Sequence, residues 1–270
     1  MPDKMDSTPE NVSMPDPDTE TKCLNCSSEL AGQFCHICGQ SASITRYRLR
    51  SIGKEIFEQF RKIDAMTTFR TFWALTKNPG DFVSAYLSGK RTGFLSPVKY
   101  FFYSFVVQVL VGSWLFWLTN DHTLDQMSHV EFRSEIVMFI STGFWGVLWR
   151  LFYRKADLNV VENIVAAIFF VGQVNFYTII LELITFPLQK AGIFPIYLPE
   201  LLQLVIQLGY SFYFARGLFR DRYLLLIPKQ LVLSCLYFVL VIVIFVGAFS
   251  IGSVSDQLNR SRLSVDNPQP

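Results

Sequence analysis

Five long apolar stretches, separated by short charged loops, occupy most of the sequence after residue 96. Each approaches the roughly 20 mostly apolar residues that a helix needs to cross a bilayer. Apolar residues make up 51% of the chain and charged residues 17%, against roughly 25% charged residues in an average soluble domain. So few charges could not solvate a water-soluble fold with this much apolar surface. The pattern predicts an all-α integral membrane protein with about five transmembrane helices, near 97–119, 136–153, 160–186, 198–215 and 230–252.

The charges between these stretches predict the orientation of the chain in the membrane. Residues 41–100 carry eleven Lys and Arg against four acidic residues, whereas residues 120–135 carry four acidic residues and a single arginine. The loops after the second and fourth stretches are basic again, and the third loop holds only Lys190. Because basic loops stay on the cytoplasmic side, the N-terminus is expected in the cytoplasm. Five crossings would then place the C-terminus outside.

The remaining segments divide by composition. Residues 1–20 carry six acidic residues and almost no bulky apolar side chain, which is typical of a disordered tail, and residues 253–270 are also expected to be disordered. Between residues 41 and 96, apolar residues recur at every third or fourth position beside basic ones. This period predicts basic amphipathic helices, too short and too charged to span a membrane but suited to its headgroup region. The transmembrane bundle is expected to cover residues 97–252.

Residues 21–40 hold four of the five cysteines, in a CxxC-x8-CxxC array. Two residues between thiolates let one tight turn present both sulfurs to a metal ion, and two such turns complete a tetrahedral site. Four thiolates leave no open position, so the array predicts a small zinc ribbon with one structural Zn²⁺ ion and no catalytic role. The expected ligands are Cys23, Cys26, Cys35 and Cys38.

Two other uses of the four cysteines stay open. They could pair as disulfides, although the cytoplasmic side of a membrane is reducing, or they could ligate an iron–sulfur cluster. A small module folded around zinc indicates a recognition role, so we expect a protein partner at the cytoplasmic face. The arginines that follow could contact nucleic acid, but attraction to anionic membrane lipids explains them better; they are Arg46, Arg48 and Arg50.

Six of the polar or ionisable residues within the third and fourth apolar stretches are candidates for a functional role: Glu162, Gln173, Asn175, Glu182, Gln203 and Gln207. Such residues are costly inside a membrane and are functional candidates for that reason. They can line a polar path for a solute or an ion, or they can hydrogen-bond between helices and hold a bundle together. The sequence shows no nucleophile paired with a histidine and no phosphate-binding loop of the GxxxxGK[ST] type. We therefore expect no enzymatic activity.

A run of short motifs extends from the cysteine array to the first apolar stretch. It comprises Phe34-Cys35, Cys38-Gly39-Gln40, Thr67-Thr68, Asn78-Pro79-Gly80, Gly89-Lys90-Arg91 and Ser96-Pro97. In these motifs the chain resembles a family of bacterial multi-pass membrane proteins of unknown function that carry a zinc-ribbon-like head. The resemblance covers about residues 20–110, and Ser27 departs from the glycine that is commoner after the first CxxC. The resemblance implies a location in the bacterial inner membrane and brings no known activity.

Lys90 and Arg91 lie a few residues before the first apolar stretch, where adjacent cations can contact lipid phosphates. For the protein as a whole, two functions are considered. The favoured one is a non-enzymatic scaffold or adaptor that docks a partner through its cytoplasmic zinc ribbon. The alternative is a transporter or channel for a small solute or an ion, built on the six polar residues of the third and fourth stretches. No pattern in the sequence indicates an oligomeric state.

Overall fold

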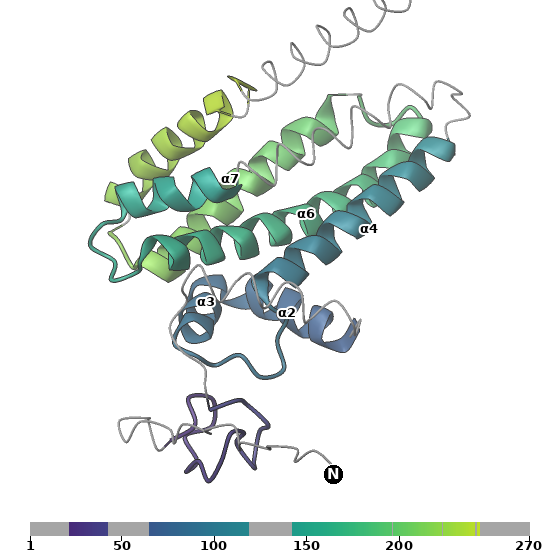
Figure 1. Cartoon of the computed structure of the whole chain (residues 1–270). Helices are drawn as coiled ribbons and strands as arrows, with labels where there is room; N and C mark the ends of the chain where they lie inside the picture. Colours follow the sequence, from purple (N-terminus) through teal and green to yellow (C-terminus); the bar gives the residue numbers. More distant parts are fainter. Residues whose placement is uncertain are drawn as a thin grey trace, which may run out of the picture. The chain divides into compact units, whose positions relative to one another are not determined.

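The computed structural model describes residues 22–42, 65–118, 142–195, 197–222, 224–240 and 242–243. The expected disordered tails and residues 43–64 of the expected amphipathic region lie outside the described residues. The chain forms two compact units, Met1–Thr45 and Arg46–Pro270. The first contains the cysteine array, and the second contains the helices labelled in Figure 1.

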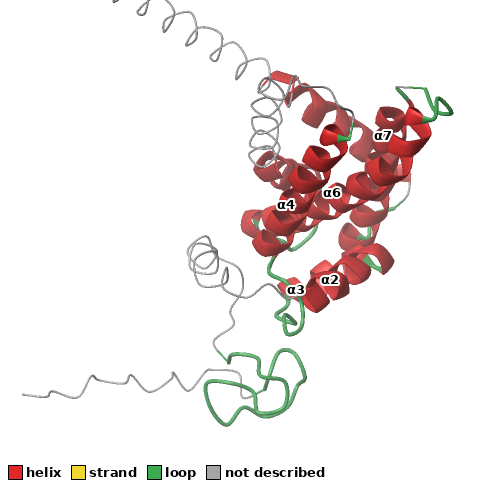
Figure 2. Cartoon of the chain, turned by 90° about the vertical axis from the view of Figure 1, so that its right-hand side faces the viewer, coloured by secondary structure: helices red, strands yellow, loops and turns green. Residues whose placement is uncertain are grey.

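The second unit is built from helices joined by loops, without strands among its described residues (Figure 2). Two short helices come first, α2 (Ala65–Lys77) and α3 (Pro79–Leu87). Three long helices follow: α4 (Pro97–Trp117), α6 (Val160–Lys190) and α7 (Leu198–Phe219). Residues 142–152 and Leu224–Leu240 are also helical. The all-α prediction is therefore confirmed for the described part of this unit.

Local signals in the sequence set where α3 and α6 begin. α3 starts at Pro79, whose missing N–H costs nothing in the first turn of a helix. α6 starts with a capping box, in which the Asn159 side chain accepts a hydrogen bond from the Glu162 backbone N–H at 2.8 Å. In return, the Glu162 carboxylate accepts a hydrogen bond from the Asn159 N–H at 2.8 Å. Glu162 therefore caps the helix on which it lies.

α6 is largely buried, and α4 lies alongside it (Figure 1). The two helices run in the same direction. Tyr100 near the start of α4 hydrogen-bonds Gln173, and Lys190 at the end of α6 donates to the Leu118 carbonyl at 3.2 Å. α7 runs the opposite way, because its last third packs on the first half of α6 and its beginning lies beside the end of α6. These directions are the ones expected of a first, a third and a fourth membrane crossing.

The loops that follow residue 152 and α7 meet at one end of the helical unit. The Lys229 ammonium lies 5.0 Å from the centre of the Tyr153 ring, and the ring centres of Trp149 and Phe219 are 5.6 Å apart. Both loops are basic, and their charge predicts the cytoplasmic side for both. The fold therefore brings together two loops that charge alone assigns to one face.

Aromatic side chains fill the core around α6. Trp145, Trp149, Phe170 and Phe214 are buried. Their rings stack or meet edge to face, with centres 5.3–6.0 Å apart. Each such pair adds about 0.5–1.5 kcal/mol beyond the area that it buries. The aromatic residues of this chain therefore pack helices together as well as facing outward.

Two described helical segments are long and apolar enough to cross a membrane, Pro97–Leu115 and Val160–Lys190. They coincide with the first and third of the expected spans. The prediction of five spans is not supported beyond these two. The expected second span, 136–153, is described only from residue 142, and the fifth, 230–252, lies partly outside the described residues.

α7 coincides with the expected fourth span but is not apolar enough to count as one. Its 22 residues would suffice in length. However, Glu200, Gln203 and Gln207 lower its mean hydropathy. Leu224–Leu240, at the place of the fifth span, is apolar but shorter.

Candidate functional site

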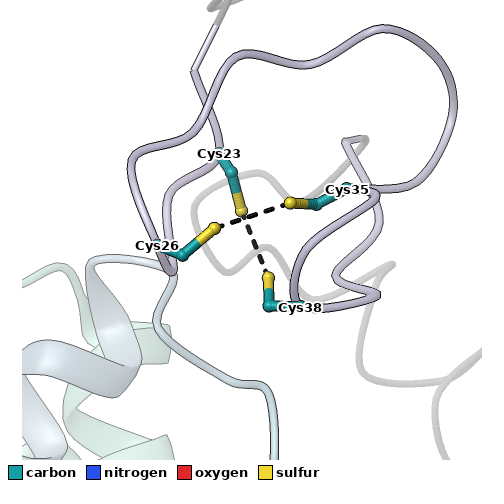
Figure 3. A group of neighbouring side chains, drawn as sticks. All are labelled: Cys23, Cys26, Cys35 and Cys38. Carbon is teal, nitrogen blue, oxygen red and sulfur yellow. Dashed lines mark hydrogen bonds between the residues drawn. The ribbon is translucent and has the colours of Figure 1, made fainter.

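Cys23, Cys26, Cys35 and Cys38 come together in the first unit (Figure 3), with one Sγ atom each and all four within 4.8 Å of one another. The Sγ atoms of Cys23 and Cys38 are 3.6 Å apart, and those of Cys26 and Cys35 are 3.5 Å apart. Metal–sulfur bonds of about 2.3 Å in a tetrahedron separate the sulfurs by about 3.8 Å. The four cysteines can therefore hold a metal ion with little rearrangement.

Each CxxC pair lies in a turn of the same form. In each turn, the N–H of the first cysteine donates to the carbonyl five residues on, and the N–H four residues on donates back to the cysteine carbonyl, at 2.8–2.9 Å. The residue at that fourth position has a positive φ in both turns, 60° at Ser27 and 73° at Gly39. Isolated antiparallel bridges close the turns, Lys22 with Glu29 and Phe34 with Ser41. Local sequence therefore shapes each half of the site.

Hydrogen bonds to sulfur favour thiolates in part of the cluster. The Ser28 hydroxyl, 3.1 Å from the Cys35 Sγ, and the Cys38 backbone N–H lower the pKa of Cys35 to about 5. The Gln40 backbone N–H lowers the pKa of Cys38. The Cys26 N–H lowers the pKa of Cys23, but burial and the thiols of Cys38 and Cys26 raise it to about 11 overall. A metal cation favours deprotonation of all four thiols.

No disulfide joins these residues, since all five cysteines of the chain are free thiols. Cys23 and Cys35 are buried, whereas Cys26 is exposed. Four sulfurs fill a tetrahedral coordination sphere and leave no position for water or a substrate. The arrangement therefore suits a structural metal centre and offers no open position for metal catalysis.

Gln173 is fully buried where α6 meets α2 and α4. Its Oε1 accepts a hydrogen bond from the Tyr100 hydroxyl, and its Nε2 donates to the Thr76 Oγ1 at 3.0 Å. Two residues further along α6, the Asn175 Nδ2 donates to the Ser104 Oγ of α4 at 3.3 Å. Gln173 and Asn175 therefore join α6 to its neighbours.

Glu182 and Gln203 line one cavity, of about 190 Å³, between α4, α6 and α7. Gln108 of α4 donates to both carboxylate oxygens of Glu182 at 3.0 Å. Glu162 lies in the capping box at the start of α6, and Gln207 is half-buried on α7 and does not line this cavity. Of the six polar residues of the expected path, the described structure brings only Glu182 and Gln203 into a shared cavity.

Lys90 and Arg91 follow the end of α3. Lys90 is exposed, whereas Arg91 is half-buried. The Arg91 Nε donates to the Tyr86 carbonyl at 3.3 Å, and the guanidinium lies 5.6 Å from the centre of the Tyr86 ring. Arg91 thus satisfies a carbonyl near the end of α3. A contact of this pair with lipid phosphate stays a prediction.

Two contacts of α2 and α3 were not apparent from the sequence. The buried Thr71 Oγ1 accepts a hydrogen bond from the Leu95 backbone N–H at 3.0 Å and so fastens the loop before α4 to α2. Gly80 of α3 lies against Gly217 of α7, where a Cβ on Gly80 would be 2.0 Å from the Gly217 carbonyl carbon. The N-P-G motif predicted a turn, but its glycine also permits this close backbone approach.

A protein-family model described as "Protein of unknown function (DUF3667)" matches residues 67–109. The match begins in α2, contains α3 and ends within α4. It includes the threonine, N-P-G and G-K-R motifs and leaves out the cysteine head. No curated protein and no solved structure matches the chain. The similarity to known proteins therefore lies in the segment that packs against Gln173 and Gly217.

Proposed function

We propose that the protein is a membrane-integrated, non-enzymatic adaptor that docks a protein partner through its cysteine head. The head would be folded around a structural zinc ion and would lie in the cytoplasm. The observation that carries this proposal is the closed set of four sulfurs, all within 4.8 Å of one another, in a unit separate from the helices. A closed site of this kind shapes a recognition module and does not itself react.

Zinc fits the donor set best. Four thiolates in a tetrahedral arrangement are typical of structural zinc sites. An iron–sulfur cluster uses the same ligands, but Cys26 is exposed, and the polar sequence around the cysteines offers no apolar shell for a cluster. Zinc measured by elemental analysis, at one ion per chain and without iron, is the expected result.

Two large apolar side chains of the head are exposed, Phe34 by 64% and Ile37 by 67%. Both belong to the second half of the head, next to the ligands Cys35 and Cys38. We take these two side chains as the contact surface of the head in this proposal. The expected partner is a cytoplasmic protein with an apolar cleft that receives these two side chains.

Crosslinking in native membranes, followed by mass spectrometry, tests the adaptor role. Three full-length chains are compared, the wild type, Cys35→Ser/Cys38→Ser and Phe34→Ser/Ile37→Ser, with zinc content measured on the same samples. The cysteine variant should lose both zinc and the partner, whereas the surface variant should keep zinc and lose the partner. Identical partners for all three chains would contradict docking. The metal site would then only stabilise the local fold of the head.

A second candidate function is transport of a small solute or an ion. The cavity lined by Glu182 and Gln203 favours it, because a carboxylate between helices is a common element of ion pathways. Cation flux into proteoliposomes that contain the full chain is the readout. Transport requires that Glu182→Gln lowers the flux and that Cys35→Ser/Cys38→Ser leaves it unchanged. Equal flux in the wild type and Glu182→Gln would argue against it.

A multi-pass location in the bacterial inner membrane, with the N-terminus in the cytoplasm, is part of the proposal. The two apolar segments, the common direction of α4 and α6, and the meeting of two basic loops support it. An impermeant thiol reagent should label Lys190→Cys on intact cells and should label Lys155→Cys only after permeabilisation. The reverse labelling pattern would show that the chain has the opposite orientation in the membrane.

A further inference from the structure

A hollow of about 230 Å³ lies between the end of the helical residues 142–152 and the beginning of Leu224–Leu240. One wall is the turn after residue 152, and the other is formed by Phe219 at the end of α7, Asp221 in the loop that follows and Lys229 in the helical segment Leu224–Leu240. The turn and this loop are the two basic loops that meet at one end of the helical unit. None of the residues considered as site candidates from the sequence lines this hollow.

The charged residues that line the hollow are three cations and one carboxylate: Arg154, Lys155, Lys229 and Asp221. The Lys229 Nζ is 2.5 Å from the Asp221 Oδ2, so these two charges compensate each other. The hydrogen bond from Lys229, followed by the charges of Lys229 and Lys155, lowers the pKa of Asp221. The carboxylate is therefore ionised at neutral pH, and Arg154 and Lys155, both exposed, supply the excess positive charge.

Packing holds Lys229 in place, and hydrogen bonds hold the backbone of the turn that carries Arg154 and Lys155. The Lys229 Nζ lies 5.0 Å from the centre of the Tyr153 ring, which stacks on Phe219 at 4.1 Å. In the turn that carries Arg154 and Lys155, the Ala156 N–H donates to the Tyr153 carbonyl at 3.0 Å. The Arg150 Nη1 donates to the Arg154 carbonyl at 3.3 Å. The hollow is thus a built feature of the fold, with an aromatic floor and a hydrogen-bonded turn.

Exposed apolar side chains lie in or near the segments that form this hollow. Leu151 lines it and is 49% exposed. Leu224 and Leu225 do not line it, but they lie in the sequence between its lining residues Asp221 and Lys229 and are 87% and 51% exposed. A soluble anion would gain nothing from such neighbours. An anionic phospholipid has a phosphate for the cations and acyl chains for the leucines.

We propose that this hollow binds the phosphate group of an anionic phospholipid from the cytoplasmic leaflet. The phosphate oxygens accept hydrogen bonds from Arg154 and Lys155, Lys229 is the third cation, and an acyl chain lies along Leu151 and Leu224. Phosphate suits this set because its oxygens can accept from several charged donors at once. Basic pockets between membrane helices on the cytoplasmic side bind anionic headgroups by the same chemistry. The site does not depend on the docking role of the cysteine head.

Native mass spectrometry of the full chain in detergent tests the site, with phosphatidylglycerol, phosphatidylcholine or inorganic phosphate added. We expect saturable binding of phosphatidylglycerol and much weaker binding of the other two. Lys155→Gln should weaken phosphatidylglycerol binding about fivefold, because a basic residue at an anionic surface contributes about 1 kcal/mol. Asp221→Asn should strengthen the binding, because it removes the carboxylate that opposes the phosphate.

Lys190→Gln is the matched control, since Lys190 lies at the opposite end of α6, and it should bind phosphatidylglycerol like the wild type. Opposite effects of Lys155→Gln and Asp221→Asn separate a charge effect from damage to the fold. Equal phosphatidylglycerol binding by the wild type and Lys155→Gln overturns the proposal, as does equal binding of phosphatidylcholine. Tighter binding of inorganic phosphate than of phosphatidylglycerol assigns the hollow to a soluble anion and overturns the lipid assignment.

Discussion

Ser27 and Gly39 occupy equivalent positions in the two turns of the cysteine head, and both have a positive φ, of 60° and 73°. Glycine adopts this conformation freely because it has no Cβ, whereas other residues lose about 1–2 kcal/mol in it. The first turn is therefore strained where the second is not. Glycine at position 27 would relieve the strain.

Ser27→Gly should raise the affinity of the full chain for zinc by about fivefold, because about 1 kcal/mol of backbone strain is removed and metal binding is coupled to folding of the head. Gly39→Ala should lower the affinity by a similar factor. Competition with a zinc chelator measures both. Gly32→Ala is the control: a Cβ meets no atom within 4 Å at Gly32 or Gly39, but only Gly39 has a positive φ. Equal losses at the two positions would refute the backbone explanation.

Acidification should release zinc from the head, and Ser28→Ala should shift the release to higher pH. The Ser28 hydroxyl is the largest cause that lowers the pKa of Cys35 to about 5. Because this pKa is lowered, the Cys35 thiolate stabilises the folded head fully above the pKa of an unfolded cysteine. This stabilisation is lost as the pH falls through about 5. Without the hydroxyl, protons compete with zinc for the Cys35 sulfur at a higher pH. A zinc-sensitive dye followed against pH reports the midpoint, and an unchanged midpoint in Ser28→Ala would show that the hydroxyl has no such effect.

Gly80→Ala should destabilise the helical unit strongly, by about 1–3 kcal/mol or more. The added Cβ would lie 2.0 Å from the backbone of Gly217, so α3 and α7 would have to move apart. Gly217→Ala should cost less, because its Cβ would be 3.0 Å from the Gly80 Cα. Thermal unfolding in detergent measures both. Gly209→Ala, on the same helix with nothing within 4 Å, should be neutral or slightly stabilising, because alanine favours a helix more than glycine does; a comparable loss there would show that the α3–α7 contact is not the cause.

Tyr100→Phe should destabilise the helical unit by about 1–3 kcal/mol, because the Oε1 of the buried Gln173 loses its hydrogen-bond donor. Gln173→Leu in the same background should then cost less than it does in the wild type. A double-mutant cycle on chemical unfolding gives the coupling between the two residues. Tyr197→Phe, an exposed tyrosine, is the control, and an equal cost for both tyrosines would mean that the buried bond adds nothing.

The four cysteines of the candidate metal site could be identified from the sequence, because each CxxC pair lies within one short turn. The helical segments Pro97–Leu115 and Val160–Lys190 could also be anticipated, since length and apolar content suffice for them. The number of membrane spans was harder to predict, because five were expected and two described segments qualify by length and apolar content. α7 contains Glu200 and two glutamines and is not among the described segments that qualify as membrane spans by length and apolar content.

Spacing and composition along the chain were enough to predict the cluster of four cysteines, the apolar helices and the basic loops, because each of these features depends on residues close together in the sequence. The packed structure was needed to learn that Gln173 bonds Thr76, 97 residues away, and that Gly80 touches Gly217. It was also needed to find the hollow between the two basic loops. Such contacts depend on how each helix is rotated about its axis and which helix it crosses, and the periodicity of a single helix does not specify either.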